Sequence, residues 1–200
     1  ASANVWYANG TVRSAVNTTI DRTLQRRITR GMKRQNAMPI TKIVRSTPDY
    51  GTENVKASYI AIVHPDLEPA IRSLTDFVPA EKYGSISPYD NELGKCEDVR
   101  YLNSTLLEPY LSAGGAPGGT VLSTNGSNAD VYPVIFLGQE AFGNVALKGM
   151  FAVQLMVANP RPTPGADPLA QKGTVGWKSM QACVILNDAW MSVAEVAAPV

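Results

Sequence analysis

The apolar residues of this chain lie mostly in short runs of strand length, and a single segment repeats them at helical spacing. That segment predicts an amphipathic helix over Thr19–Asn36, with an apolar stripe at every fourth position: Ile20, Leu24, Ile28 and Met32. We expect Thr18 or Thr19 to cap its first turn and Asp21 to favour the helix dipole there. Pro39 should stop it.

The remaining runs favour strands, because β-branched and aromatic side chains fit a pleated, half-buried surface. Lys56–Val63 predicts a buried strand, and His64-Pro65-Asp66 then opens a helix that continues through Leu74. We expect a helical turn over Ala80–Tyr83, a short strand over Val99–Leu102, and later apolar runs over Val131–Leu137, Met150–Val157 and Val175–Leu186. This order lacks the regular alternation of a doubly wound sheet and predicts an α+β fold.

Two segments have the composition of connections. Leu111–Asp130 carries five glycines among Ser, Asn and Pro residues, which predicts a long flexible loop with few apolar side chains to bury. A loop of this length inside a compact domain is typical of an interaction surface. The prolines between Pro160 and Pro168 favour an extended arm.

The charge balance excludes a chain dominated by polyanion binding, since 18 Lys and Arg residues face 17 Asp and Glu residues. Hydrophobic residues make up 44% of the chain, enough to bury a core. The apolar runs are too short to cross a bilayer, so we expect no membrane partner.

Residues able to do chemistry are few. Cys96 and Cys183 are far apart and match no metal-binding spacing, and the glycines at 114–119 lack the Lys-Ser/Thr of a phosphate loop. The carboxylates Glu92, Glu97 and Asp98 are expected to form a solvated face. We therefore expect no catalytic residues, no cofactor and no metal.

The alternative is that the chain is an α+β enzyme in which the lone histidine, His64, serves as the general base. No nucleophile motif such as Gly-x-Ser-x-Gly accompanies it, and a His-Pro-Asp junction between a strand and a helix is explained by helix capping.

The polar side of the Thr19–Asn36 helix is strongly basic. Such a row can pair with acidic residues of the same chain or of a neighbouring subunit, or bind phosphates as a nucleic-acid-binding module. No aromatic side chain is interleaved to stack bases, and the rest of the chain is neutral, so we favour pairing with carboxylates. The candidate subunit-interface residues are Arg22, Arg26, Arg27, Arg30, Lys33 and Arg34.

Four stretches, taken in their order and spacing, resemble the major capsid (coat) proteins of tailed bacteriophages with the Hong Kong 97-type (HK97-like) fold. Within that family the similarity is to the branch related to the coat protein of phage N4. The stretches are Tyr7–Gly10 with the basic helix ending at Asn36–Pro39, Tyr59–Asp66, Asp130–Pro133 leading to Gly138–Gly143, and Trp177-Lys178 with Ile185–Met191.

The resemblance implies an axial lobe over residues 18–145 and a peripheral lobe made of residues 1–17 and 146–200. It also implies a chain that lacks the N-terminal arm, extended loop and spine helix of the family, and is therefore a fragment. The implied function is a structural protein that is not an enzyme and self-assembles into an icosahedral head. Its implied partners are copies of itself in hexamers and pentamers, scaffolding and portal proteins, and the packaged double-stranded DNA. Its implied location is the virion, after synthesis in the bacterial host cytoplasm.

Overall fold

The computed structural model describes residues 4–40, 44–46, 52–54, 56–83, 89–145, 153–160, 169–179 and 182–200. The chain divides into two compact units. The first comprises Ala1–Ala141 and Asn187–Val200, and the second comprises Phe142–Leu186.

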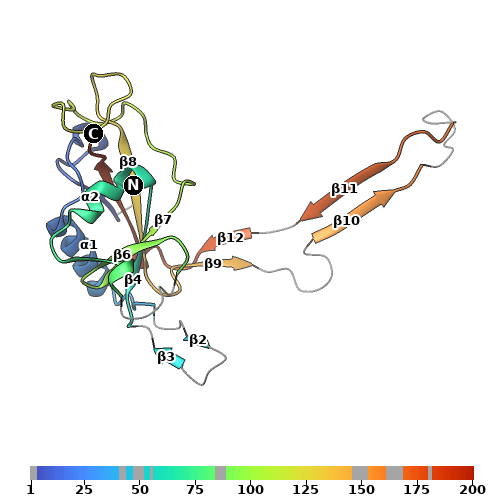
Figure 1. Cartoon of the computed structure of the whole chain (residues 1–200), viewed down its shortest axis with the longest axis horizontal. Helices are drawn as coiled ribbons and strands as arrows, with labels where there is room; N and C mark the ends of the chain where they lie inside the picture. The colour runs from blue at the N-terminus through green and yellow to red at the C-terminus, as the bar shows by residue number, and fades with distance from the viewer. Residues whose placement is uncertain are drawn as a thin grey trace. The chain divides into compact units, whose positions relative to one another are not determined.

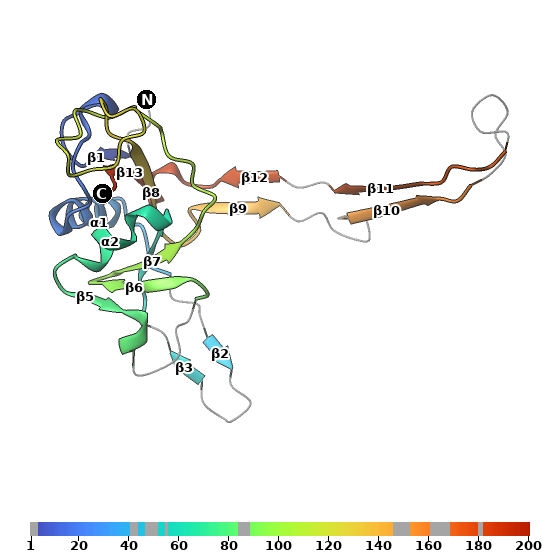
Figure 2. The ribbon, with the colours of Figure 1, turned by 45° about the horizontal axis from the view of Figure 1, so that its top comes forward.

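The first unit is built on a mixed seven-stranded sheet in the order β1-β13-β8-β4-β7-β6-β5 (Figures 1 and 2). Its central strand β4 pairs in parallel with β7 on one side and antiparallel with β8 on the other. At one edge β1 pairs in parallel with β13, so the start and end of the chain share this sheet. The strand bounds are β1 Val5–Tyr7, β4 Tyr59–Val63, β5 Phe77–Pro79, β6 Glu92–Cys96, β7 Val99–Asn103, β8 Val131–Leu137 and β13 Met191–Ala197. A separate two-stranded ribbon pairs β2 (Val44–Ser46) with β3 (Thr52–Asn54).

The described helices are few, and the chain combines them with a sheet, as the prediction of an α+β fold has it. The α-helices are α1 (Arg22–Arg34) and α2 (Glu68–Arg72), and the 3-10 helices are η1 (Arg13–Ala15), η2 (Pro65–Leu67), η3 (Ala80–Lys82) and η4 (Asp188–Trp190). The predicted long helix is confirmed within shorter bounds. Its N-cap is Asp21, whose carboxylate accepts from the Thr23 amide, so the prediction of Thr18 or Thr19 as the cap is wrong. The helix ends at Arg34, five residues before Pro39. Asn36, two residues beyond its end, adopts a left-handed backbone with φ 57°, as is common after a helix C-terminus.

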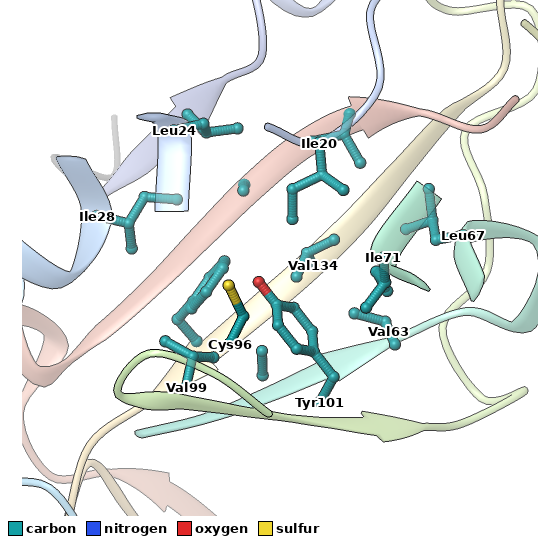
Figure 3. Close-up of a cluster of buried hydrophobic side chains, with 14 of the residues drawn as sticks. Ile20, Leu24, Ile28, Val63, Leu67, Ile71, Cys96, Val99, Tyr101 and Val134 are labelled. Atoms are coloured by element: carbon teal, nitrogen blue, oxygen red, sulfur yellow. The ribbon is translucent and has the colours of Figure 1, made fainter. Parts of the chain in front are cut away.

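One face of the sheet and the apolar sides of α1 and α2 form the core (Figure 3). The predicted stripe of α1 is buried, with Leu24, Ile28 and Met32 at most 4% exposed. These side chains pack in one cluster with alternate residues of the strands, such as Tyr101 of β7 and Val134 of β8. Burial of the stripe therefore fixes which side of α1 faces the sheet and leaves its basic side outward.

The loop Leu111–Asp130 is more ordered than its composition indicates. The Gly114 amide donates to the Ala129 carbonyl oxygen, the Ala129 amide donates to the Gly115 carbonyl oxygen, and the Gly115 amide donates to the Val16 carbonyl oxygen. Val121 and Ala129 are buried against Ala197 of β13. The Asp130 carboxylate accepts from the Ser112 amide and the Thr124 hydroxyl, and so ties the two ends of the loop together. The expectation that this segment has little to bury is therefore wrong.

The second unit consists of two antiparallel ribbons. One pairs β9 (Phe142–Val145) with β12 (Ala182–Ile185), and the other pairs β10 (Val153–Ala158) with β11 (Thr174–Ser179). The apolar run Val175–Leu186 thus contributes to both ribbons. Every residue of β10, β11 and β12 is exposed.

The two units differ in extent from the predicted lobes, residues 18–145 and residues 1–17 with 146–200. Both β1 and β13 belong to the first unit, because β13 hydrogen-bonds to β8 along its whole length and to β1 on its other side. The assignment of axial and peripheral lobes stays a prediction. The proline-rich stretch at 161–168 lies outside the described residues.

Candidate subunit-interface surfaces

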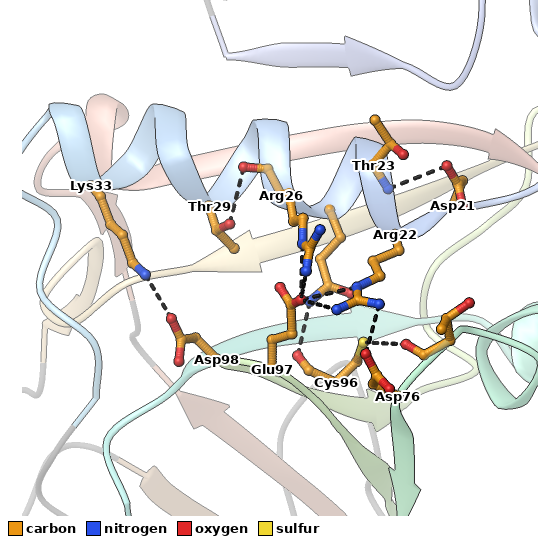
Figure 4. A network of polar contacts seen from close by, with 12 residues as sticks. Asp21, Arg22, Thr23, Arg26, Thr29, Lys33, Asp76, Cys96, Glu97 and Asp98 are labelled. Carbon is orange, nitrogen blue, oxygen red and sulfur yellow. Dashed lines mark hydrogen bonds and ion pairs between the residues drawn. The ribbon is translucent and has the colours of Figure 1, made fainter.

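The basic side of α1 begins with two arginines that share one carboxylate (Figure 4). Arg22 Nη2 lies 2.8 Å from Glu97 Oε1, and the Nε of Arg26 donates to the same oxygen at 2.9 Å. Arg22 also pairs through Nη1 with Asp76 at 2.6 Å. The two guanidinium groups hold the pKa of the Glu97 carboxyl below its usual value. Both arginines are therefore engaged within the chain.

The acidic partners other than Asp76 come from the tight turn between β6 and β7. Glu97 and Asp98 occupy this turn, and Glu97 adopts a left-handed backbone with φ 53°. Lys33 Nζ lies 2.6 Å from Asp98 Oδ2, a contact that raises the pKa of Lys33. The expectation that these carboxylates form a merely solvated face is wrong, because α1 lies above the turn and supplies their cations.

Glu92 is the third carboxylate of that predicted cluster, and its side chain is fully buried. Its Oε1 accepts from Arg100 Nη1 at 2.8 Å and from the Tyr83 hydroxyl at 2.9 Å, and the Arg100 side chain is only 8% exposed. Arg100 also donates to the Ser58 hydroxyl. These hydrogen bonds compensate the desolvation of the charges and give this pair a structural role.

The other half of the basic side is exposed and differently placed. Arg27 lies over the Trp6 ring, 5.6 Å from its centroid. In the described part of the chain, Arg30 and Arg34 have no carboxylate within ion-pair distance. Both line a shallow groove of about 410 Å³ that runs along α1 beside Glu97 and Asp98. Within the described part of the chain, the predicted interface row is therefore divided into Arg22, Arg26 and Lys33, which pair with carboxylates, and Arg30 and Arg34, which do not.

One polar residue of α1 points into the core, which the apolar stripe does not predict. Gln25 is 1% exposed, and its Nε2 donates to the Cys96 carbonyl oxygen at 2.9 Å. Its Oε1 accepts from the Tyr101 hydroxyl at 2.7 Å. The position of Gln25 could have predicted its burial. It follows Leu24 directly and lies three residues before Ile28, so in a helix it lies at the edge of the apolar stripe.

His64 has the predicted capping role. Its Nδ1 accepts from the Asp66 amide at 3.2 Å at the start of η2, and its ring lies 5.3 Å from that of Tyr132. The Tyr132 hydroxyl in turn donates to the Asp66 carboxylate at 2.8 Å. Among the described residues, no hydrogen bond joins the ring of His64 to a hydroxyl or a thiol.

Other chemistry-bearing groups are dispersed. Within the described ranges no group of three or more His, Cys, Asp or Glu side chains could hold a metal ion. Both thiols are free: Cys96 is buried, which raises its pKa, and Cys183 is exposed on β12. No described helix is long and apolar enough to span a membrane.

The second unit carries a different kind of surface. Large apolar side chains of its two ribbons are about half to three-quarters exposed. They are Phe142, Val145, Val153, Leu155, Met156, Val157, Val175, Trp177, Val184 and Ile185.

Comparison with solved structures identifies similar folds in the capsids of three phages. The chain matches the capsid of Ralstonia phage GP4 with a TM-score of 0.60 and 13% identity, over 99% of this chain and 53% of that chain. It matches the head structure of Helicobacter pylori bacteriophage KHP40 with a TM-score of 0.58 and 11% identity, over 98% and 60%. It matches the capsid asymmetric unit of cyanophage Pam1 with a TM-score of 0.55 and 13% identity, over 98% and 54%.

At these identities the likeness shows the fold: a sheet-rich α+β chain similar to phage capsid structures. The chain spans between 53% and 60% of the length of these capsid chains. No protein-family model and no curated protein matches the sequence.

Proposed function

We propose that this chain is structural: it belongs to the major capsid protein of a tailed bacteriophage, self-assembles into the icosahedral head around double-stranded DNA, and catalyses no reaction. The observation that carries the proposal is the fold similarity to three phage capsid chains over at least 98% of this chain. Copies of the same chain, as hexamers and pentamers, are the principal partners. Scaffolding and portal proteins are the others, and the virion, assembled in the host cytoplasm, is its location.

The proposal extends to the finer features of the coat fold. The first unit corresponds to the axial lobe of an HK97-like subunit, and the ribbons of the second unit correspond to strands of the peripheral lobe. The relation to the phage N4 branch rests on the four sequence stretches described above. The exposed apolar ribbons support a role in assembly, because monomeric proteins rarely expose large contiguous apolar patches.

The direct test is expression of the complete reading frame that encodes these residues, followed by electron microscopy and sedimentation of the product. We expect closed particles of uniform size. A complete protein that stays monomeric under every assembly condition, with or without scaffolding protein, would refute the capsid role.

Within that role, we propose that Arg30 and Arg34, the free cations of α1, contact carboxylates of a neighbouring subunit. Arg30→Glu with Arg34→Glu should reduce the particle yield of the complete protein while leaving the melting temperature unchanged, because neither arginine has an ion-pair partner among the described residues.

The matched control is Lys56→Glu with Lys82→Glu, which changes the net charge equally at two exposed lysines. This control should assemble normally. Equal yields from both double variants would contradict the assignment, and binding of duplex DNA lost only in the α1 variant would reassign the free cations to the genome.

A further inference from the structure

The sequence contains two Asn-Gly pairs, Asn9-Gly10 and Asn125-Gly126. In such a pair the side-chain amide carbon of the asparagine lies within reach of the next backbone nitrogen, and glycine has no side chain to shield that nitrogen. Asparagine is one of the chemically labile residues of proteins, and ring closure at an Asn-Gly pair is its most direct route of decay. The two pairs have the same local chemistry, so any difference between them comes from the fold.

The second pair, Asn125-Gly126, lies in open surroundings. Both residues are exposed. Gly126 has φ 74°, and beyond its chain neighbours no described atom lies within 4 Å of the place where a Cβ would stand. In the described part of the chain, no hydrogen bond engages the Gly126 amide or Asn125 Nδ2. The nitrogen that would attack and the nitrogen that would leave are therefore not held by hydrogen bonds.

The side-chain oxygen of Asn125, by contrast, accepts several hydrogen bonds. Asn125 Oδ1 accepts from the amides of Ser127 and Asn128 at 2.9 Å and 2.8 Å. The Ser123 hydroxyl donates to the same oxygen at 3.3 Å. Donors directed at a carbonyl oxygen stabilise the negative charge that it gains when a nucleophile adds to its carbon, as in an oxyanion hole. The loop therefore polarises the Cγ–Oδ1 bond of Asn125 toward attack.

The first pair, Asn9-Gly10, is held by the fold. Asn9 Nδ2 donates to Asn17 Oδ1 at 2.8 Å, and Asn9 Oδ1 accepts from the Asn17 amide at 3.0 Å. A Cβ on Gly10 would stand 2.6 Å from Ala15 Cβ, so this glycine packs closely against its neighbour. Ring closure at Asn9 would break the hydrogen bond of the leaving nitrogen and pull the side chain away from Asn17.

We propose that Asn125 is a site of spontaneous covalent modification, at which the loop promotes closure of a cyclic imide with Gly126. The Gly126 nitrogen bonds to Asn125 Cγ, and the Cγ–Nδ2 bond breaks. The proton of the Gly126 amide passes through solvent to the leaving nitrogen, which departs as ammonia. Water then opens the ring at either carbonyl and leaves aspartate or isoaspartate. Each modified copy gains a negative charge on an exposed loop, and this chemistry is independent of the capsid role.

The test compares the two pairs in the complete protein, folded and unfolded. Samples are kept in warm, mildly alkaline buffer, and tandem mass spectrometry of their peptides locates the conversion of amide to acid over time. In the folded protein we expect Asn125 to convert roughly tenfold faster than Asn9, the effect of about 1.4 kcal/mol on an activation barrier. In concentrated guanidinium chloride the two rates should converge, because only the shared local chemistry remains. Equal rates in the folded protein, or slower conversion of Asn125 when folded than when unfolded, would overturn the proposal.

Two glycine variants separate the ring closure from the conformation of the loop. Gly126→Ala should slow conversion of Asn125 several-fold, because the methyl group shields the attacking nitrogen. Gly118→Ala is the matched control, since Gly118 lies in the same loop with φ 59° and equally open surroundings. This control should leave the rate at Asn125 unchanged. An unchanged rate in Gly126→Ala, or equal slowing by both variants, would count against attack by the Gly126 nitrogen.

Discussion

Replacement of Gln25 by leucine tests how α1 is attached to the sheet. The side chain is buried, and it satisfies the Cys96 carbonyl at 2.9 Å and the Tyr101 hydroxyl at 2.7 Å. Leucine has a similar volume but no polar atoms, so both groups lose this hydrogen bond. An unsatisfied buried polar group costs about 1–3 kcal/mol, and the added apolar burial offsets part of that cost. We expect Gln25→Leu to lower the free energy of unfolding by about 2–4 kcal/mol, which corresponds to a fall in melting temperature of roughly 5–15 °C.

The measurement is urea unfolding followed by far-ultraviolet circular dichroism, arranged as a double-mutant cycle with Tyr101→Phe. The phenylalanine removes the hydroxyl that Gln25 accepts from, so the double variant leaves fewer unpaired groups than the two single variants together. We expect the double variant to be less destabilised than the sum of the single variants by about 1–2 kcal/mol. Strict additivity, or a loss below about 0.5 kcal/mol for Gln25→Leu, would refute the reasoning.

Four other outcomes follow from the structure. His64→Ala should cost about 1 kcal/mol through loss of the cap, measured by thermal melting, and an enzymatic activity that vanished with it would contradict the structural role. Glu97→Gln should destabilise the protein by up to about 1 kcal/mol at neutral pH. The pKa of Glu97 is lower in the folded than in the unfolded protein. The difference in unfolding free energy between the wild-type protein and Glu97→Gln is therefore present above the unfolded pKa of Glu97 and should disappear as pH falls through its folded pKa. Unfolding curves at several pH values would measure it. In hydrogen exchange, the bonded amides of Gly114 and Ala129 should be protected and those of Gly118 and Gly119 should exchange rapidly; uniform exchange across the loop would contradict its observed packing. Association of the complete protein should persist at 1 M salt in light scattering, where ion pairs alone would dissociate.

Local patterns in the sequence predict the elements that depend on neighbours in the chain. The stripe from Ile20 to Met32 predicts both the helix and its buried side, because four-residue spacing places these side chains on one face. The continuous apolar run Val131–Leu137 forms β8 with the same bounds. The cap at His64 follows equally from a junction of a few residues.

Elements that depend on distant partners could not be predicted in this way. β13 consists largely of small residues and contains a buried carboxylate, Glu195, so its composition does not indicate a strand. Pairing with β8 and β1 orders it, and Arg13 neutralises Glu195 at 2.6 Å from 182 positions earlier in the chain. The basic side of α1 presents the same difficulty. The sequence displays its cations, but only the fold brings Glu97 and Asp98 beneath three of them.

This division of the cations bears on what could hold copies of the chain together. Three cations of α1 form ion pairs within the subunit: Arg22, Arg26 and Lys33. An exposed ion pair between the remaining arginines and a neighbouring copy would contribute only about 0–1 kcal/mol to the free energy of association. The exposed apolar side chains of β10 and β11, among them Leu155 and Trp177, offer a larger gross term, because burial of apolar surface contributes about 25 cal/mol per Å². The freedom lost on association, an estimated 4–15 kcal/mol, cancels part of that gain. On these magnitudes burial of apolar surface would contribute more to an association of copies than ion pairs of Arg30 and Arg34, whose charges would act mainly on which surfaces meet.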